Sequence, residues 1–209
     1  MSIVVVDFGT GNLRSVVKAL QHVAPKRKIK TSFDSEKISR ADQIVMPGQG
    51  AMGSWMAAMR EHDLRDVIVE AINTKPVLGI CLGLQALYES SEEDNGVDGL
   101  GFFSGKVKRF STTDKILKVP HMGWNNVAQC QTHPLWHDVP DNSRFYFVHS
   151  YYPDSEDVSD IAGETNYGIS FTAAAARQNV FAVQFHPEKS HHAGLRLLRN
   201  FVEWDGARH

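Results

Sequence analysis

The sequence has only two cysteines among its 209 residues, Cys81 and Cys130, and it has no surplus of basic residues. Two cysteines cannot form a disulfide framework, so we expect free thiols in a reducing compartment and therefore a cytoplasmic protein. Lysine and arginine number 22 against 24 acidic residues, so no nucleic-acid partner is expected. No apolar run reaches the roughly 18 residues of a membrane span, and the N-terminus lacks the pattern of a signal peptide.

The sequence also lacks internal repeats and low-complexity linkers. Its hydrophobic content of 42% and charged content of 22% are ordinary for a globular protein. A chain of this length suits one compact domain with a sizeable core, so we expect residues 1–209 to form a single domain. The one acidic run, SSEEDNGVDG at 90–99, predicts a solvated loop rather than a linker.

The first half of the chain alternates strand and helix patterns. Short apolar runs occupy 3–6 (IVVV), 43–46 (QIVM) and 76–80 (PVLGI), and apolar residues at the spacing of an amphipathic helix follow each of them. Three successive strand–helix units predict a mainly parallel sheet flanked by helices, in an α/β fold. In such sheets the functional site lies beyond the carboxyl ends of the strands.

The second half has a different pattern. Segments with strand character are separated by turn residues and lie at 105–110, 124–130, 144–152, 169–176 and 179–185. They predict additional, largely antiparallel strands. A last amphipathic helix is expected near 190–204, where leucines at 195, 197 and 198 supply an apolar face.

Cys81 stands in the stretch GICLG, residues 79–83, where a strand is expected to become a helix. A nucleophile with a glycine two residues before and after it is the pattern of an elbow, a sharp turn that exposes the nucleophile. A thiolate at a helix N-terminus is stabilised electrostatically, and the backbone N–H of Leu82 would face the developing oxyanion. Because free cysteine is also a common core residue, a packing role is the alternative at this point.

A base for this thiol is available in FHPE, residues 185–188. Residues two apart in an extended chain point the same way, so Glu188 can orient the imidazole of His186. Pro187 biases His186 toward β geometry. The alternative is a strand that ends at a proline beside a solvated histidine and glutamate. Together with Cys81, however, these residues are more simply explained as nucleophile, base and orienting carboxylate.

Two glycine-rich stretches predict different things. PGQG at 47–50 follows an expected strand, so it can form a turn and can also bring backbone N–H groups to an oxyanion. GTGN at 9–12 does not predict a dinucleotide site, because Arg14 stands where G-x-G-x-x-G needs its third glycine. The pair His191 and His192 lacks a further ligand at a useful spacing. We expect no metal and no cofactor.

The motifs PGQG, GICLGLQ and FHPE, in this order, resemble the triad-type (class I) glutamine amidotransferases over nearly the whole chain. The resemblance implies that Cys81 attacks the side-chain amide of glutamine, His186 shuttles the proton and Glu188 orients His186. Ammonia would leave, and water would hydrolyse the glutamyl thioester.

Further roles follow from the same resemblance by motif position. It implies that Gly50 and Leu82 frame the oxyanion and that Gln85 contacts the bound glutamine. The segment His149-Ser150-Tyr151 resembles the one that holds the amino-acid end of the substrate in this family.

Three further motifs closely resemble the glutaminase-subunit family of imidazole glycerol phosphate synthases: PHMGWN at 120–125, DFGTGNLRS at 7–15 and NYGISFTAA at 166–174. The resemblance implies a heterodimer with a separate (β/α)8 cyclase subunit. That partner would use the ammonia to make imidazole glycerol phosphate and an aminoimidazole carboxamide ribotide in histidine biosynthesis. We expect Asn12 and Trp124 at the interface, with a core role as the alternative for Trp124. Gln49 departs from the family, where valine is frequent.

Two other functions remain as alternatives. One is the glutaminase of another ammonia-using synthase, for anthranilate or pyridoxal phosphate, which would share the triad but lack PHMGWN. The other is a non-catalytic α/β protein whose elbow cysteine senses oxidants. Such a sensor would need Cys81 but neither His186 nor Glu188.

Overall fold

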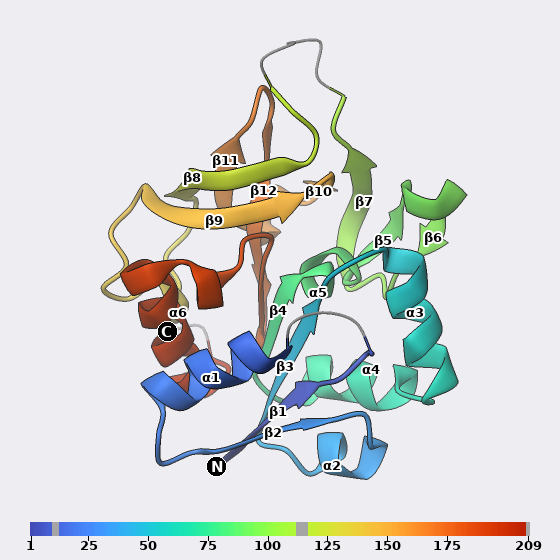
Figure 1. Cartoon of the computed structure of the whole chain (residues 1–209), viewed down its shortest axis with the longest axis vertical. Coiled ribbons are helices and arrows are strands. Elements are labelled where there is room, and N and C mark those ends of the chain that lie inside the picture. The colour runs from blue at the N-terminus through green and yellow to red at the C-terminus, as the bar shows by residue number, and fades with distance from the viewer. Residues whose placement is uncertain (10–12, 112–116, 208–209) are drawn as a thin grey trace.

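The computed structural model describes residues 1–9, 13–111 and 117–207, and a mixed sheet of nine strands runs through it (Figure 1). Five neighbouring strands are parallel, in the order β2 (Lys28–Ser32), β1 (Ser2–Val6), β3 (Gln43–Gly48), β4 (Val77–Cys81) and β13 (Val180–Val183). Antiparallel strands continue the sheet in the order β12 (Ser170–Arg177), β11 (Ile161–Asn166), β8 (His121–Gln129) and β9 (Ser143–His149). The expected α/β fold is confirmed, although β13 comes late in the chain and still joins the parallel part.

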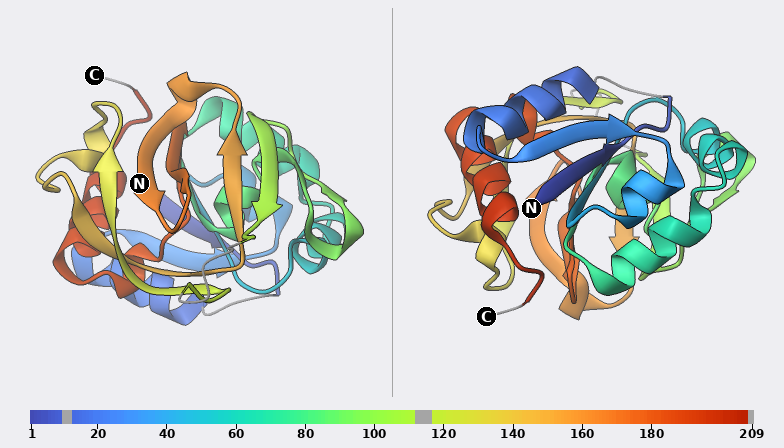
Figure 2. Two further views of the ribbon diagram at one scale, coloured as in Figure 1. Left: turned by 90° about the horizontal axis from the view of Figure 1, so that it is seen from above. Right: turned by 90° about the horizontal axis from the view of Figure 1, so that it is seen from below.

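Helices cover both faces of the parallel part (Figures 1 and 2). One face carries α1 (Leu13–Val23) and α6 (His191–Glu203), and the other carries α2 (Ser35–Ser39), α3 (Met52–Glu61) and α4 (Arg65–Thr74). Alternation along β1 explains the two layers, because Ile3 and Val5 pack with α1 and α6 while Val4 and Val6 pack on the other side. Strands buried on both faces read as continuous apolar runs, which is why β1, β3 and β4 could be predicted from the sequence.

A second sheet of four strands lies beside the first. Its order is β10 (Tyr151–Ser155), β7 (Phe103–Arg109), β5 (Tyr88–Ser91) and β6 (Val97–Asp98). Single 3-10 turns complete the structure at η1 (Glu93–Asn95), η2 (Pro134–Trp136), η3 (Val158–Asp160) and η4 (Pro187–Lys189). Within the described ranges, no helix has both the length and the apolarity to cross a bilayer.

The helix expected after Cys81 is much shorter than its pattern suggests. It is the single turn α5 (Leu82–Gln85), and the chain then enters β5. The carbonyl of Ala86 accepts from the N–H of Leu100, and that of Leu87 accepts from two later residues, 102 and 103. These long-range bonds use the carbonyls that a longer helix would need, so tertiary contacts end the helix.

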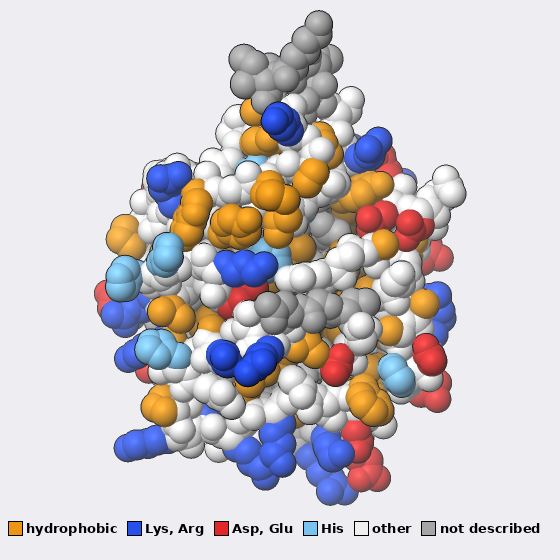
Figure 3. All heavy atoms as spheres, viewed as in Figure 1, with side chains coloured by type: hydrophobic (Ala, Val, Ile, Leu, Met, Phe, Trp, Pro, Cys, Tyr) orange, Lys and Arg blue, Asp and Glu red, His pale blue; other side chains and the backbone are white. Residues whose placement is uncertain are grey.

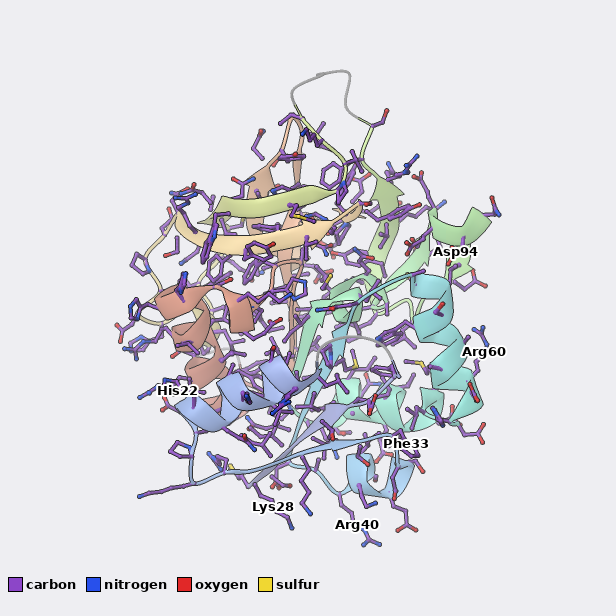
Figure 4. All side chains as sticks on the ribbon, viewed as in Figure 1. His22, Lys28, Phe33, Arg40, Arg60 and Asp94 are labelled. Carbon is purple, nitrogen blue, oxygen red and sulfur yellow. The ribbon has the colours of Figure 1, made fainter. Side chains whose placement is uncertain are left out.

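Two other expectations are corrected. The apolar run at 55–71 forms two helices, α3 and α4, because the chain turns between them at Asp63 with φ +50°. The acidic run at 90–99 is not a solvated loop, since it forms parts of β5 and β6 around η1. Two strands, β2 and β11, lacked a clear apolar pattern. β2 is an edge strand with exposed lysines such as Lys28, labelled in Figure 4, a feature that discourages pairing with other chains.

Candidate active site

The chain turns sharply at Cys81, the last residue of β4. Cys81 has φ +56° and ψ −106°, which a side chain adopts only under strain. Both flanking glycines are required by close packing. A Cβ on Gly83 would lie 1.8 Å from the carbonyl oxygen of Met46, and one on Gly79 would lie 2.8 Å from the carbonyl oxygen of Gly83. The turn places the sulfur beyond the carboxyl end of the sheet.

His186 and Glu188 form a buried pair just after β13. Nδ1 of His186 lies 2.9 Å from Oε1 of Glu188, and the two side chains are only 2% and 1% exposed. The backbone here is not extended as expected, because Pro187–Lys189 is the 3-10 turn η4. The turn still brings both side chains to the same side, so Glu188 fixes the ring orientation of His186.

The electrostatic setting of His186 favours a proton on its ring. Burial alone would lower the pKa of His186, but hydrogen bonding and charge interactions with Cys81 and Glu188 raise it to about 10. Nε2 of His186 is buried and has no well-formed hydrogen bond to any described residue. The thiol therefore lies close enough to affect the imidazole but is not yet aligned with it, as is common before substrate binds.

A cavity of about 450 Å³ opens beside Cys81 and His186. Its wall contains every proposed substrate or oxyanion residue, namely Gly50, Leu82, Gln85, His149, Ser150 and Tyr151. The amide nitrogen of Gln85 donates to the carbonyl oxygen of Tyr151 at 3.0 Å. Residues from β4, α5, β9 and η4 thus surround one space large enough for an amino acid.

The loop that follows β3 borders this cavity and is held at both ends. Gly48 pairs in register with Cys81, and Nε1–H of Trp55 donates to the carbonyl of Pro47 at 3.1 Å. On the far side, the N–H of Met52 donates to Oε2 of Glu93 at 2.7 Å. Gly50 lies between these anchors with φ +91°, a conformation that favours glycine.

Comparison with known proteins identifies the family. Residues 4–204 match the glutamine amidotransferase class-I family. The imidazole glycerol phosphate synthase subunit HisH of Nitrosococcus oceani is 52% identical over 205 residues, which cover 98% of each chain. The HisH subunit of Pseudomonas syringae pv. syringae is 52% identical over 209 residues, again covering 98% of each chain. The chain belongs to the HisH family of class I glutamine amidotransferases.

The fold of this amidotransferase extends to more distant proteins. A glutamine amidotransferase of Thermotoga maritima has a TM-score of 0.65 at 14% identity, covering 97% of this chain and 96% of that one. At this identity the likeness shows a shared fold alone.

Two cavity or near-cavity residues of the amidotransferase were not found from the sequence. Glu93 lies in the cavity wall, where burial raises the pKa of its carboxyl group. Its neighbour Asp94, labelled in Figure 4 beside α3, accepts from the N–H of Gly53 at 3.3 Å. The acidic run gave no signal of this folding. The second is Gln184, whose side chain lies 3.6 Å from the sulfur of Cys81. Because Gln184 stands two residues before His186, the strand pattern could have placed both side chains on the same side.

Trp124 lies outside the cavity. It is 37% exposed on β8, and its ring stacks on that of His191 at 4.9 Å and an interplanar angle of 4°. It is therefore a surface residue rather than a core one. Asn12 lies outside the described residues. Across the ranges that the structure describes, no group of three or more His, Cys, Asp or Glu side chains could hold a metal ion.

Proposed function

We propose that this amidotransferase hydrolyses glutamine to glutamate and ammonia and supplies the ammonia to imidazole glycerol phosphate synthesis in histidine biosynthesis. The observation that carries the proposal is the arrangement of Cys81 and the bonded pair His186–Glu188 around one amino-acid-sized cavity. The 52% identity to HisH subunits of that synthase indicates which product pathway the ammonia enters.

The reaction uses Cys81 as nucleophile. Its sulfur attacks the side-chain carbonyl carbon of glutamine, and the thiol proton passes through His186 to the leaving nitrogen, which departs as ammonia. A water molecule then attacks the glutamyl thioester and gives its proton to His186. Glutamate leaves, and the proton returns to the sulfur. Glu188 keeps Nε2 of His186 directed at the reacting atoms throughout.

The tetrahedral intermediate needs donors for its oxyanion. The backbone N–H of Leu82 starts α5 next to the sulfur, and the loop at 48–51 brings Gly50 to the same cavity. We infer that these two N–H groups form the oxyanion hole. Because both ends of the loop are anchored, Gly50 can reorient without moving β3 or α3.

The cavity wall also contains groups for the amino-acid end of glutamine. The carboxyl of Glu93 suits the α-ammonium group, and Gln85, Ser150 and Tyr151 offer polar contacts. His149 contributes shape rather than charge, because burial lowers its pKa to about 3. We propose that the whole chain acts as one domain in the cytoplasm, where its two cysteines stay free.

The partner is proposed to be a (β/α)8 cyclase subunit that docks over β8 and β9. Hydrophobic side chains gather on this face (Figure 3), and they include Met122, which is 61% exposed, and Trp124. Pro120, in the same segment, lines the cavity. A partner bound here would cover the cavity mouth and could receive ammonia without loss to solvent. Asn12 is proposed to join this interface.

The deciding experiment measures glutamate release from glutamine with and without the cyclase and its ribotide ligand. We expect stimulation by the liganded cyclase, its disappearance in Cys81→Ser, and its retention in the matched control Cys130→Ser. Activity that survives in Cys81→Ser would remove the proposed nucleophile. A chain that needs Cys81 for oxidant sensing, but releases no glutamate and does not need His186, would instead be a redox sensor.

A further inference from the structure

The side chain of a buried glutamine, Gln184, contacts the sulfur of Cys81 on the side away from the cavity. Gln184 follows β13 and is 0% exposed, and its backbone N–H donates to the carbonyl of Ala173. Its side-chain Nε2 lies 3.6 Å from Sγ of Cys81. Gln184 does not line the cavity, so it can act on bound glutamine only through the cavity residues that it contacts, Cys81 and Gln85.

The direction of this amide is set by its neighbours. The carbonyl oxygen of Tyr151 can only accept, so the group of Gln85 that lies 3.0 Å from it must be the nitrogen Nε2. The same nitrogen lies 3.0 Å from the side chain of Gln184, which must therefore present its oxygen. The nitrogen of Gln184 is left to face the sulfur.

The carbonyl of Tyr151 is itself held by a second donor. Nδ1 of His149 lies 2.7 Å from it and must carry a proton. Burial lowers the pKa of His149 to about 3, so its other nitrogen, Nε2, is an unprotonated acceptor at neutral pH. That nitrogen lies 3.0 Å from Nδ1 of His121, which therefore donates. Hydrogen bonds donated by His149 and by Gln85 thus converge on the carbonyl oxygen of Tyr151, and the amide nitrogen of Gln85 also donates to Gln184.

We propose that Gln184 is a positioning residue for Cys81: its Nε2–H group donates to the sulfur, holds it toward the cavity and stabilises the thiolate during attack. This deepens the proposed function and rests on the role of Cys81 as nucleophile. A donor binds a charged sulfur more strongly than a neutral thiol, so the bond strengthens as the proton leaves for His186. His186 and Gln184 then act from different sides, one as proton acceptor and the other as fixed donor.

The chain contains a matched control. Gln43 is also a buried glutamine, and its Nε2 donates to the carbonyls of Phe201 and Trp204 at 2.9 Å each. These bonds tie α6 to the sheet and do not involve Cys81. Gln43→Met and Gln184→Met remove the same chemical groups at similar volume, so only the site differs between them.

The experiment measures the rate of Cys81 alkylation by iodoacetamide between pH 5 and 10 in the full chain, with Cys130 as an internal standard. We expect Gln184→Met to move the pH midpoint of Cys81 alkylation upward by about one to two units, the effect of losing a hydrogen bond to a charged group. The profile of Cys130 should stay unchanged, and Gln43→Met should leave the profile of Cys81 unchanged. The glutaminase kcat of Gln184→Met should fall more than its KM rises.

An unchanged Cys81 profile in folded Gln184→Met overturns the proposal, even if glutaminase activity is lost. If Gln184→Met does not fold, Gln85→Met tests the same bond, because the amide of Gln184 loses the partner that sets its direction. A smaller upward shift supports the proposal, and no shift overturns it. A shifted profile in a chain that never releases glutamate would keep the positioning role and reject the glutaminase function.

Discussion

The two halves of the nine-stranded sheet contribute to the site in different ways. In the parallel half, every residue of β4 is buried between helices, and this half supplies Cys81 and the loop at 48–51. In the antiparallel half, β8 alternates buried and exposed residues, so one face of that strand remains open to a partner. A layer covered on both faces therefore holds Cys81, while a layer with an open face supplies the surface where a partner can bind.

The site forms at the last strand pair of the parallel half, next to the antiparallel half. β4 and β13 pair in parallel, with Ile80 beside Val183. The next residues in each strand direction are Cys81 and Gln184, and His186 follows two positions later. The strand pairing therefore sets the positions of Cys81, Gln184 and His186 relative to one another.

The largest effect on activity should distinguish His186, the proposed base, from the other histidine of the cavity, His149. We expect His186→Ala to lower kcat by a factor on the order of 10³–10⁴ because the proton acceptor is lost. His149→Ala should mainly raise KM, because His149 lines the cavity beside the segment that is proposed to bind glutamine. Steady-state kinetics of both variants with the cyclase present will check this. The reverse pattern would reassign the base to the other histidine.

A second prediction tests the rigidity of the parallel half. Gly83→Ala should destabilise the fold by about 3 kcal/mol or more, because its Cβ would meet the backbone oxygen of Met46 at 1.8 Å. Gly53→Ala is the control, because the added Cβ would meet only the carboxylate of Asp94, which can move. Urea unfolding measures both. Equal stability of the two variants would show that the elbow tolerates a side chain.

A third prediction concerns pH and the antiparallel half. Burial lowers the pKa of His149 to about 3 and that of His121 to about 4, whereas a histidine in the unfolded chain has a pKa of about 6.5. Between these folded-state pKa values and about pH 6.5, the unfolded state binds more protons than the folded state. The free energy of unfolding therefore falls as the pH drops from about 6.5 toward these values. The raised pKa of His186 has the opposite sign: its contribution is complete below about 6.5 and is lost as the pH rises through about 10.

Replacing His121 and His149 should reduce this loss of stability in acid. We expect His121→Gln with His149→Gln to reduce the loss of unfolding free energy between pH 7 and 4.5 by several kcal/mol, up to ~5 kcal/mol. The exposed His137 is the matched control, and His137→Gln should leave the loss unchanged. Urea titrations at several pH values measure it. An undiminished loss in the double variant would assign the acid sensitivity to other groups.

The smallest effect is expected at the open face. Trp124→Ala should weaken binding of the cyclase by about 10- to 100-fold, since exposed aromatics often dominate interfaces. His22→Ala, on α1 and far from β8 in Figure 4, should leave that affinity unchanged. Calorimetric titration with the cyclase gives both values. Equal affinities would place the docking surface elsewhere.

Much of the fold could be predicted because its signals are local. β1, β3 and β4 are short apolar runs buried on both faces, and α1 and α6 have clear apolar stripes. The long helix expected after Cys81 was wrong, because its end depends on hydrogen bonds from residues 100–103. Glu93 was missed for a similar reason: only the folding of the acidic run against α3 brings it into the cavity wall.

The sequence by itself determined the local geometry at Cys81 and at the pair His186 and Glu188. The glycines of GICLG allow the turn at Cys81, and the two-residue spacing of His186 and Glu188 allows their hydrogen bond, since both are local properties of the backbone. Tertiary structure alone decided that these elements meet and that the amide nitrogen of Gln184 faces the sulfur. Gln184 and Cys81 lie 103 positions apart, so their contact depends on the register of β4 and β13. The direction of that amide depends in turn on the carbonyl of Tyr151, which belongs to the other sheet.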